Sequence, residues 1–179
     1  MAGSADAEDG PSTLRAARRA LLALRLGIGV IWTLNLVYVL LPANSFFPAF
    51  ADTASSFGPT TLSGPGIATY VASHSGFFSV GVAVVTAYLA AAFLLGASTK
   101  VACLVGAGFN VMLLVTQFGQ VAMIPGATDV GPQPLYLAIY VALFLSAGIE
   151  PLSMDRWLIL ARFAASRRYE LSAEPATAG

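Results

Sequence analysis

The chain has 179 residues, of which 57% are hydrophobic and only 10% are charged, whereas about 25% of residues are charged in a typical soluble domain. Residues 53–99 include no Asp, Glu, Lys or Arg, and a soluble domain of this size could not cover its surface in that way. Nine basic and nine acidic residues leave no net charge, so we expect no nucleic-acid partner, which would require a basic face.

The residue counts also limit the possible cofactors. The single cysteine, Cys103, rules out an intramolecular disulfide, and the single histidine, His74, cannot supply both axial ligands of a bis-histidine haem. No metal-ligating cluster, flavin site or glycine-rich phosphate loop stands out in the sequence. Any redox cofactor is therefore expected to be a bound quinone or to belong to a partner chain.

The basic residues form three groups that hydrophobic segments separate. They are Arg15, Arg18, Arg19 and Arg25 before or within the first segment, Lys100 between the second and third, and Arg156, Arg162, Arg167 and Arg168 after the fourth. Because Lys and Arg concentrate on cytoplasmic loops, the pattern predicts four transmembrane helices with both termini in the cytoplasm.

The frequent Ala, Gly and Arg are typical of a GC-rich bacterial source. We therefore expect the chain to lie in the inner (plasma) membrane, with membrane lipid as a partner.

The first predicted helix covers residues 20–41 and ends at Pro42, after a tail at 1–19 that we expect to be disordered. Its apolar run is longer than the roughly 7–15 residues of a signal-peptide core and can cross about 30 Å of hydrocarbon. We therefore expect this helix to be retained. Arg25 lies inside it, so the side chain is expected to reach the interface or to be paired within the bundle.

Residues 42–76 are predicted to form a long connection on the outer side of the membrane, rich in Pro, Gly, Ser, Thr and Phe. Connections longer than about 12–15 residues usually have a function or a structure of their own. Within this one, residues 67–73 are predicted to form a short helix at the outer interface. Aromatic residues, which are enriched at membrane boundaries, occur at Phe46, Phe47, Phe50, Phe57 and Tyr70.

Three more transmembrane helices are predicted, at residues 77–97, 101–123 and 135–149. They are joined by a tight turn at 96–100 and by an outer loop at 125–134. An amphipathic interfacial segment follows at 154–163, and residues 164–179 are expected to be disordered. The expected fold is an all-α, up-down bundle of four transmembrane helices over residues 20–163, with a long outer loop and a C-terminal interfacial helix.

Arg25 requires a partner or a function, because polar side chains are costly inside a membrane. In an up-down bundle, the start of the first helix and the end of the fourth lie on one membrane face. Glu150 or Asp155 is therefore a candidate partner, and such an ion pair would tether the bundle at the cytoplasmic interface. Alternatively, Arg25 binds an anionic headgroup or a quinone carbonyl.

Asn35 and Asn110 are the amides that lie deepest in the predicted helices. An interhelical hydrogen bond in lipid contributes roughly 0.6–2 kcal/mol, so one interpretation is that these amides join helices. The other is that they line a polar cavity together with Gln117 and Gln120. On that interpretation, Arg25, Asn35, Asn110 and Gln117 are the candidates for binding a quinone.

His74 and Asp129 lie on the two outer connections, which an up-down bundle brings to one face. A histidine beside a carboxylate can accept and release protons near neutral pH, and a quinol oxidised at this face must release protons. The pair is therefore the candidate catalytic group. Alternatively, the two side chains tie the loops together by a hydrogen bond, or Asp129 caps the fourth helix.

Four segments carry a resemblance to a known family. The first helix opens with Leu-Arg-Leu-Gly-Ile-Gly at 24–29, and the second ends with Leu-Leu-Gly-Ala-Ser-Thr-Lys at 94–100. The second outer loop reads Gly-Ala-Thr-Asp-Val-Gly-Pro at 126–132, and the chain after the fourth helix reads Ala-Gly-Ile-Glu-Pro-Leu-Ser-Met-Asp at 147–155. In this order the segments resemble the DoxX/DoxD-like small four-helix membrane proteins, with the DoxD branch favoured by the Asp-containing loop. Met154 stands where the family has Leu.

The resemblance implies a function in a membrane oxidoreductase. DoxD-type proteins are associated with thiosulfate:quinone oxidoreductase as its larger, membrane-spanning subunit, and DoxX-like proteins of actinobacteria with complexes that handle oxidative stress. What this implies here is a membrane subunit of a quinone-linked oxidoreductase, in sulfur-compound oxidation or redox homeostasis. It would use menaquinone or ubiquinone together with partner subunits.

Two other functions stay open. The outer connections contain Asp52 and Asp129 but no Lys or Arg, which disfavours oxidation of an anion such as thiosulfate by this chain alone. Small-residue helix faces and the aromatic outer loop also suit a non-enzymatic adaptor that docks and stabilises another membrane complex. A carrier function is less favoured, because the sequence has neither an inverted repeat nor broken helices.

Overall fold

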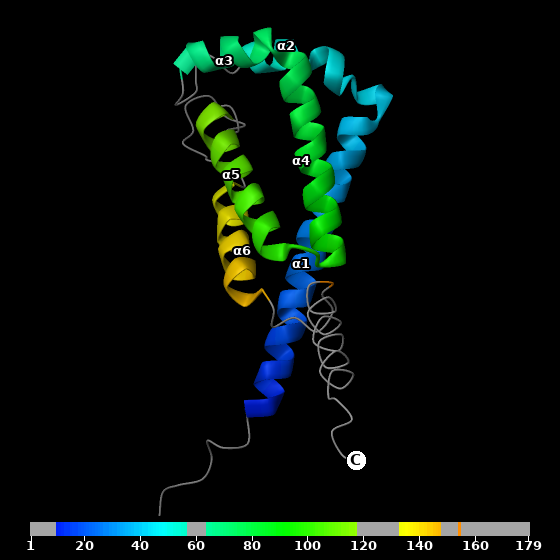
Figure 1. The fold of residues 1–179 in the computed structure, drawn as a ribbon, viewed down its shortest axis with the longest axis vertical. Coiled ribbons are helices and arrows are strands. Elements are labelled where there is room, and N and C mark those ends of the chain that lie inside the picture. The colour runs from blue at the N-terminus through cyan, green and yellow to red at the C-terminus, as the bar shows by residue number, and fades with distance from the viewer. Residues whose placement is uncertain (1–9, 57–63, 118–132, 148–153, 155–179) are drawn as a thin grey trace, which may run out of the picture.

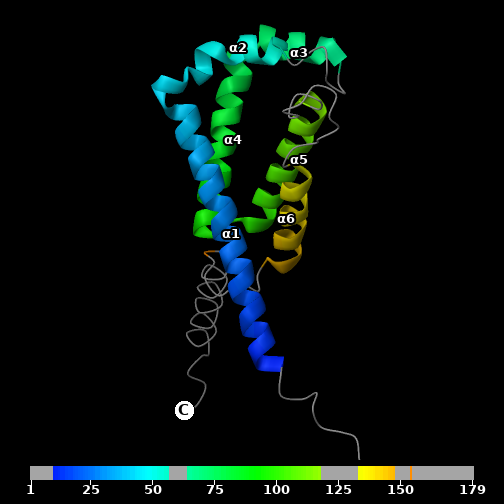
Figure 2. The ribbon, with the colours of Figure 1, turned by 180° about the vertical axis from the view of Figure 1, so that it is seen from behind.

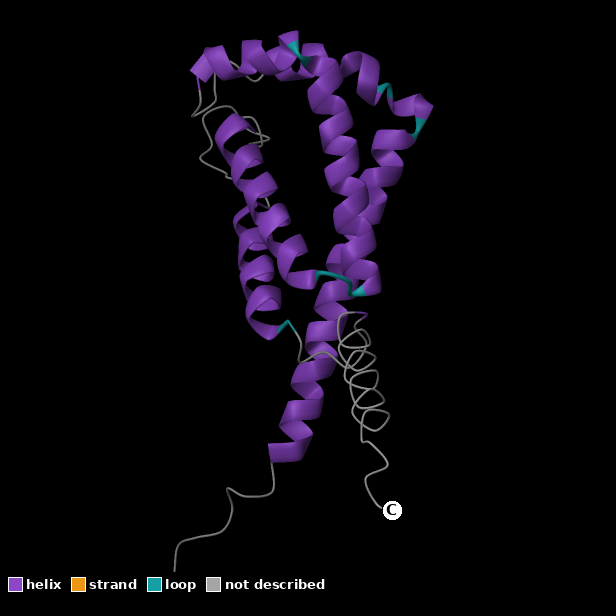
Figure 3. Ribbon diagram, in the orientation of Figure 1, coloured by secondary structure: helices purple, strands orange, loops and turns teal. Residues whose placement is uncertain are grey.

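The computed structural model describes residues 10–56, 64–117, 133–147 and 154, and the regular structure in this part of the chain is entirely helical (Figure 3). The elements in chain order are α1 (Gly10–Leu40), the 3-10 helix η1 (Pro42–Asn44), α2 (Phe46–Ser56), α3 (Gly64–Ser73), α4 (Ser75–Leu95), α5 (Thr99–Gln117) and α6 (Gln133–Ser146). The predicted all-α class is therefore confirmed for the described residues.

The longer helices α1, α4, α5 and α6 alternate in direction along the chain (Figure 1). α1 packs along α4, and α5 packs along α6, so that the molecule contains two antiparallel helix pairs. The start of α1 and the end of α6 point toward the same end of the molecule, and the view from behind shows the same arrangement (Figure 2). α4 and α6 each begin two residues earlier than predicted, at Ser75 and Gln133.

α2 and α3 lie across the other end of the molecule (Figure 1), where they contact each other. We call these two helices the cap. The short helix predicted at 67–73 is present as the longer α3, whereas α2 falls in a segment for which no helix is predicted. Pro48 occupies the first turn of α2, where proline breaks no helical hydrogen bond.

α1 begins at Gly10 rather than at residue 20. The predicted disordered tail is therefore wrong for residues 10–19, which form the first turns of the helix. Six of these ten residues are Ala, Arg or Leu, which have high intrinsic helix propensity. Because the segment is polar, a prediction based on hydrophobic runs did not detect its helix propensity. The extension projects from the bundle on the side opposite the cap (Figure 1).

The turn between α4 and α5 reverses the chain within a few residues. Gly96 has a φ of 65° and donates its backbone N–H to the Ala92 carbonyl, which closes the C-terminus of α4. Glycine takes this left-handed conformation without the steric cost of a Cβ. Ser98 has a φ of 50°, and α5 starts at the next residue. The tight turn predicted at 96–100 is therefore confirmed.

The hydrophobic core lies where the longer helices meet, and it is closely packed. Its buried members are Ile28, Trp32, Leu89, Ala90, Ala92, Phe93, Ala102, Cys103, Tyr140 and Leu143. A Cβ added to Gly29 would lie 3.1 Å from the backbone nitrogen of Leu94, and one added to Gly106 would lie 2.8 Å from Cζ of Tyr140. The two glycines therefore allow helix contacts that a larger residue would block.

The outward faces of these helices are apolar. α1 and α4 are long and apolar enough to cross a membrane by length and composition, and shorter apolar stretches occur in α5 and α6. Exposed large hydrophobic side chains include Val30, Leu34, Val37, Val80, Val84, Leu95, Val101, Leu104, Val111, Leu135, Val141 and Leu145. Soluble monomers rarely expose apolar surface of this extent, so the surface favours association with a membrane.

Several predicted features fall outside the described residues. They are the far ends of the third and fourth predicted helices, most of the loop at 125–134, the interfacial segment 154–163 beyond Met154, and the tail 164–179.

Candidate functional site

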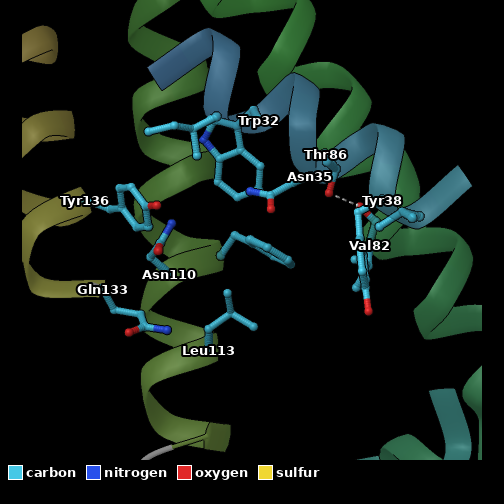
Figure 4. Close-up of a pocket in the computed structure, with 12 residues that line it drawn as sticks. Trp32, Asn35, Tyr38, Val82, Thr86, Asn110, Leu113, Gln133 and Tyr136 are labelled. Carbon is cyan, nitrogen blue, oxygen red and sulfur yellow. Dashed lines mark hydrogen bonds between the residues drawn. The ribbon is translucent and has the colours of Figure 1, made fainter. Parts of the chain in front are cut away.

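A cavity of about 210 Å³ lies between the α1–α4 pair and the α5–α6 pair (Figure 4). Its lining residues are Ile31, Trp32, Asn35, Tyr38 and Val39 of α1, Val82 and Thr86 of α4, Phe109, Asn110 and Leu113 of α5, and Gln133 and Tyr136 of α6. Most of these positions belong to the cap-facing half of their helix. All four longer helices therefore contribute to one site.

Aromatic and aliphatic side chains form much of the cavity wall. The rings of Trp32 and Phe109 pack with their centroids 5.8 Å apart and their planes tilted by 58°. Tyr136 adds a third ring from α6 (Figure 4). An engineered apolar cavity of about 150 Å³ is known to hold a benzene molecule, so the space here is sufficient for one substituted aromatic ring.

The polar groups of the cavity are amides and hydroxyls, and none of the described residues that line it is charged. Gln133 is only 7% exposed, and its Oε1 has no hydrogen-bond partner among the described residues. A buried acceptor without a donor costs about 1–3 kcal/mol. A neutral ligand that supplies hydrogen bonds would therefore be stabilised here, whereas an anion would meet no positive charge.

Asn110 belongs to a buried hydrogen-bond network that joins α1, α5 and α6. The Trp32 Nε1 donates to the Tyr140 hydroxyl over 2.9 Å. The Asn110 Nδ2 donates to the same hydroxyl over 3.3 Å and to the Gly106 carbonyl over 2.9 Å. Because Asn110 is only 2% exposed, water cannot compete for these bonds, and the network holds the amide in one orientation.

The local sequence around Gly106 explains how this network forms. Asn110 lies one helical turn after Gly106, which brings its side chain within reach of that carbonyl. The missing side chain at Gly106 leaves room for the Tyr140 ring. The same ring stacks on Phe93, with centroids 5.8 Å apart and an interplanar angle of 14°. Tyr140 is therefore positioned by α4 and α5 as well as by its own helix.

The two predicted deep amides line the same cavity. Asn110 makes the packing hydrogen bonds of the first interpretation and also lines the cavity of the second. Asn35 is exposed but borders the cavity from α1. Gln117 is the last residue of α5, and its side chain, like Gln120, lies outside the described part of the structure.

Arg25 is 2% exposed and does not line this cavity. It lies one turn before Gly29, which contacts Leu94 at the end of α4. Arg25 is therefore buried near the end of the bundle opposite the cap, away from Asn35 and Asn110. Both candidate partners, Glu150 and Asp155, lie outside the described residues.

His74 lies at the junction of α3 and α4, where its side chain is exposed. The His74 Nδ1 is 3.0 Å from both the Ser73 hydroxyl and the Tyr70 carbonyl, and its ring lies 4.4 Å from the Tyr70 ring between centroids. His74 therefore lies beside the cap, next to the end of α3, and does not line the cavity. Asp129 lies outside the described residues, so the proposed proton-handling pair stays a prediction.

Sequence reasoning did not single out Thr86, Gln133, Tyr136 or Tyr140 as site residues. A usable signal was present in α6, where Gln133, Tyr136 and Tyr140 follow one another at spacings of three and four residues. Such residues share one face of a helix. No comparable signal pointed to Thr86 in the sequence. In the structure its hydroxyl donates to the Val82 carbonyl within α4, a bond that threonine commonly makes in helices.

The site as a whole can hold a neutral ring between aromatic walls and present amide and hydroxyl groups to its substituents. The described lining supplies no nucleophile paired with a base, and no group of three or more His, Cys, Asp or Glu side chains gathers in the described residues.

Comparison of the chain with family models, with curated proteins and with solved structures finds no match.

Proposed function

We propose that this chain is a multi-pass membrane protein in which α1, α4, α5 and α6 cross the inner membrane and the cap faces outward. The apolar outer faces of these helices support this proposal. The basic residues support the orientation, because Arg15, Arg18, Arg19 and Lys100 all belong to the start of α1 or the start of α5. Both elements begin at the end opposite the cap (Figure 1). Positive residues remain on the cytoplasmic side.

Cysteine labelling tests this topology. In a Cys103→Ala background, a membrane-impermeant maleimide added to intact cells is expected to label Ser55→Cys in the cap. Ser98→Cys, in the α4–α5 turn, is expected to react only after permeabilisation. Both serines are exposed, so access depends on the membrane alone. The reverse pattern would contradict the orientation, and labelling of both positions from outside would contradict the membrane crossing of α4.

We propose further that the cavity binds the ring of a quinone or quinol and that the chain is a membrane subunit of a quinone-linked oxidoreductase. One observation carries this proposal: an uncharged cavity of about 210 Å³ with aromatic walls and amide groups at Asn35, Asn110 and Gln133. Ligand sites of this kind are mostly apolar with a few polar groups that orient the ligand. The resemblance to DoxX/DoxD-like proteins in the sequence points to the same ligand.

The cap gives no support to anion oxidation by this chain alone. Its described residues include Asp52 but no Lys or Arg, whereas recognition of a dianion such as thiosulfate normally uses such cations. A partner subunit would therefore bind the electron donor and pass electrons to the quinone held here. Quinone binding, orientation of its ring and exclusion of water would be the functions of this chain.

The test is to purify the full chain from bacterial membranes in mild detergent and to extract bound quinone for mass spectrometry. We expect about one quinone per chain and a loss of roughly tenfold or more in Asn110→Leu, because that change removes a buried polar group from the cavity wall. Thr33→Val is the matched control, since the Thr33 hydroxyl donates to the Gly29 carbonyl within α1 and Thr33 does not line the cavity.

Proteins that co-purify are identified in the same preparation. A stable partner together with bound quinone would support the oxidoreductase subunit. A stable partner without quinone would support the adaptor function, which the small-residue helix faces and the cap also suit. Recovery of the chain with neither quinone nor partner would contradict both functions.

A further inference from the structure

We propose that the cavity selects the reduced, hydroxyl-bearing form of its ligand, a hydroquinone, over the oxidised quinone. This inference rests on the proposed function and names the chemical form that the site prefers. Asn110 is the residue that determines the preference, and Tyr140 and Trp32 position it. The reason lies in which hydrogen-bonding groups of Asn110 remain available to a ligand.

The orientation of the Asn110 amide follows from the chemistry of its partners. The Gly106 carbonyl lies 2.9 Å from the amide nitrogen, and a backbone carbonyl can only accept. The atom beside it must therefore be Nδ2, which settles an assignment that is otherwise ambiguous for asparagine. One of the two Nδ2 hydrogens is used in this bond.

The second Nδ2 hydrogen is used by Tyr140. The indole Nε1 of Trp32 can only donate, so the Tyr140 hydroxyl accepts the 2.9 Å bond from it. The Asn110 Nδ2 lies 3.3 Å from the same hydroxyl and donates to it as well. Both hydrogens of the Asn110 amide therefore point to fixed protein acceptors, and neither is available to a ligand.

The carbonyl oxygen Oδ1 is then the only group that Asn110 can offer to the cavity. No described residue donates a hydrogen bond to it, and Asn110 lies in the cavity wall between Gln133 and Tyr136 (Figure 4). The neighbouring Gln133 Oε1 also lacks a donor among the described residues. Asn110 thus presents an acceptor and no donor to the cavity, while the Gln133 amide can also donate through its Nε2.

The reduced and oxidised forms of a quinone differ in the hydrogen-bonding groups that they present to the Asn110 Oδ1. A hydroquinone hydroxyl donates a hydrogen to the Asn110 Oδ1, whereas a quinone carbonyl can only accept and would place two oxygen lone pairs against each other. Leaving a buried acceptor without a donor is penalised more strongly than an average hydrogen bond is rewarded. The reduced form is therefore bound more tightly.

The remaining polar groups of the cavity do not oppose this preference. The Thr86 hydroxyl hydrogen is used by the Val82 carbonyl, so Thr86 offers only acceptor capacity. The Asn35 and Gln133 amides and the Tyr38 and Tyr136 hydroxyls can each donate or accept. They bind the second oxygen of either redox form, and the discrimination comes from Asn110.

The test measures the affinity of the full chain for menadiol and for menadione, in detergent and under anaerobic conditions. We expect menadiol to bind about tenfold more tightly, as measured by quenching of tryptophan fluorescence. Tenfold tighter binding of the reduced form also raises the midpoint potential of the bound two-electron couple by about 30 mV. Redox titration of the bound ligand gives this second, independent readout.

Two variants address the assigned residues. Asn110→Leu is expected to abolish the preference for menadiol. Tyr140→Phe removes the acceptor of one Nδ2 hydrogen, so it is expected to reduce the preference toward equal affinity while menadione still binds, because Tyr140 does not line the cavity. A purely structural role of Tyr140 would weaken both forms alike. Thr33→Val is expected to keep the wild-type ratio.

Equal affinity of the wild-type chain for both forms, or tighter binding of menadione, would overturn the inference and leave the proposed quinone site intact. Binding of neither form would overturn both. A preference that survives unchanged in Asn110→Leu and in Tyr140→Phe would show that Asn110 does not determine it.

Discussion

Arg25→Leu is expected to lower the free energy of unfolding by about 3–5 kcal/mol, the usual cost of removing one partner of a buried ion pair. Arg25 is 2% exposed within α1, and a guanidinium is buried only where an anion or several acceptors compensate its charge. The measurement is unfolding of the purified chain in mild detergent, followed by circular dichroism during SDS titration. Arg19→Leu is the control, because Arg19 is exposed and surface changes usually stay within about 0.5 kcal/mol.

A double-mutant cycle identifies the partner of Arg25. Glu150→Gln and Asp155→Asn are each combined with Arg25→Leu, and the true partner is the one whose effect is not additive with it. We expect a coupling of about 0.5–3 kcal/mol with one of the two carboxylates. Additivity with both would contradict the ion pair and favour the alternative in which Arg25 binds an anionic headgroup.

Gly106→Ala is expected to destabilise the chain by about 1–3 kcal/mol, the usual cost of overpacking a core. The new Cβ would lie 2.8 Å from Cζ of Tyr140. The Tyr140 ring cannot move away freely, because it is fully buried and its hydroxyl is bonded to Trp32 and Asn110. A shift of the ring would therefore also weaken the network that holds the Asn110 amide.

Gly108→Ala is the matched control for this prediction. It lies two residues further along α5, and an added Cβ would meet nothing within 4 Å. Since Ala is favoured over Gly in a helix by about 1 kcal/mol, Gly108→Ala is expected to be neutral or stabilising. Thermal unfolding of both variants in the same detergent gives the comparison. Equal effects at the two positions would contradict the close contact between Gly106 and Tyr140.

The predicted helices were recognisable because long apolar runs and their breaks are local properties of the chain. Pro42 ends the first run, and Gly96 ends the helix before the turn at 96–100, and both act through their own backbone geometry. The two errors arose where a helix is not apolar throughout. Residues 10–19 are polar, and α2 contains Pro48 and Asp52, so hydrophobicity did not mark either segment as helical.

The candidate site was less predictable than the helices. Asn35 and Asn110 were identified because an amide in an apolar run is costly whatever surrounds it. Their partners were not, because Trp32 and Tyr140 are 108 positions apart in the chain, and nothing local indicates that such residues meet. Arg25 was grouped with the two amides as a possible quinone ligand, whereas the structure places it near the opposite end of the bundle.

The sequence by itself determined the helical class, the apolar character of the helices and the uneven placement of the basic residues, since each depends on composition and local periodicity. Only the tertiary structure decided which polar groups share a cavity and which hydrogens of Asn110 are already bonded. The physical reason is that hydrogen-bond availability depends on the distances between groups from α1, α5 and α6. Those distances exist only when the helices pack, and Gly106 leaves the space that the Tyr140 ring occupies.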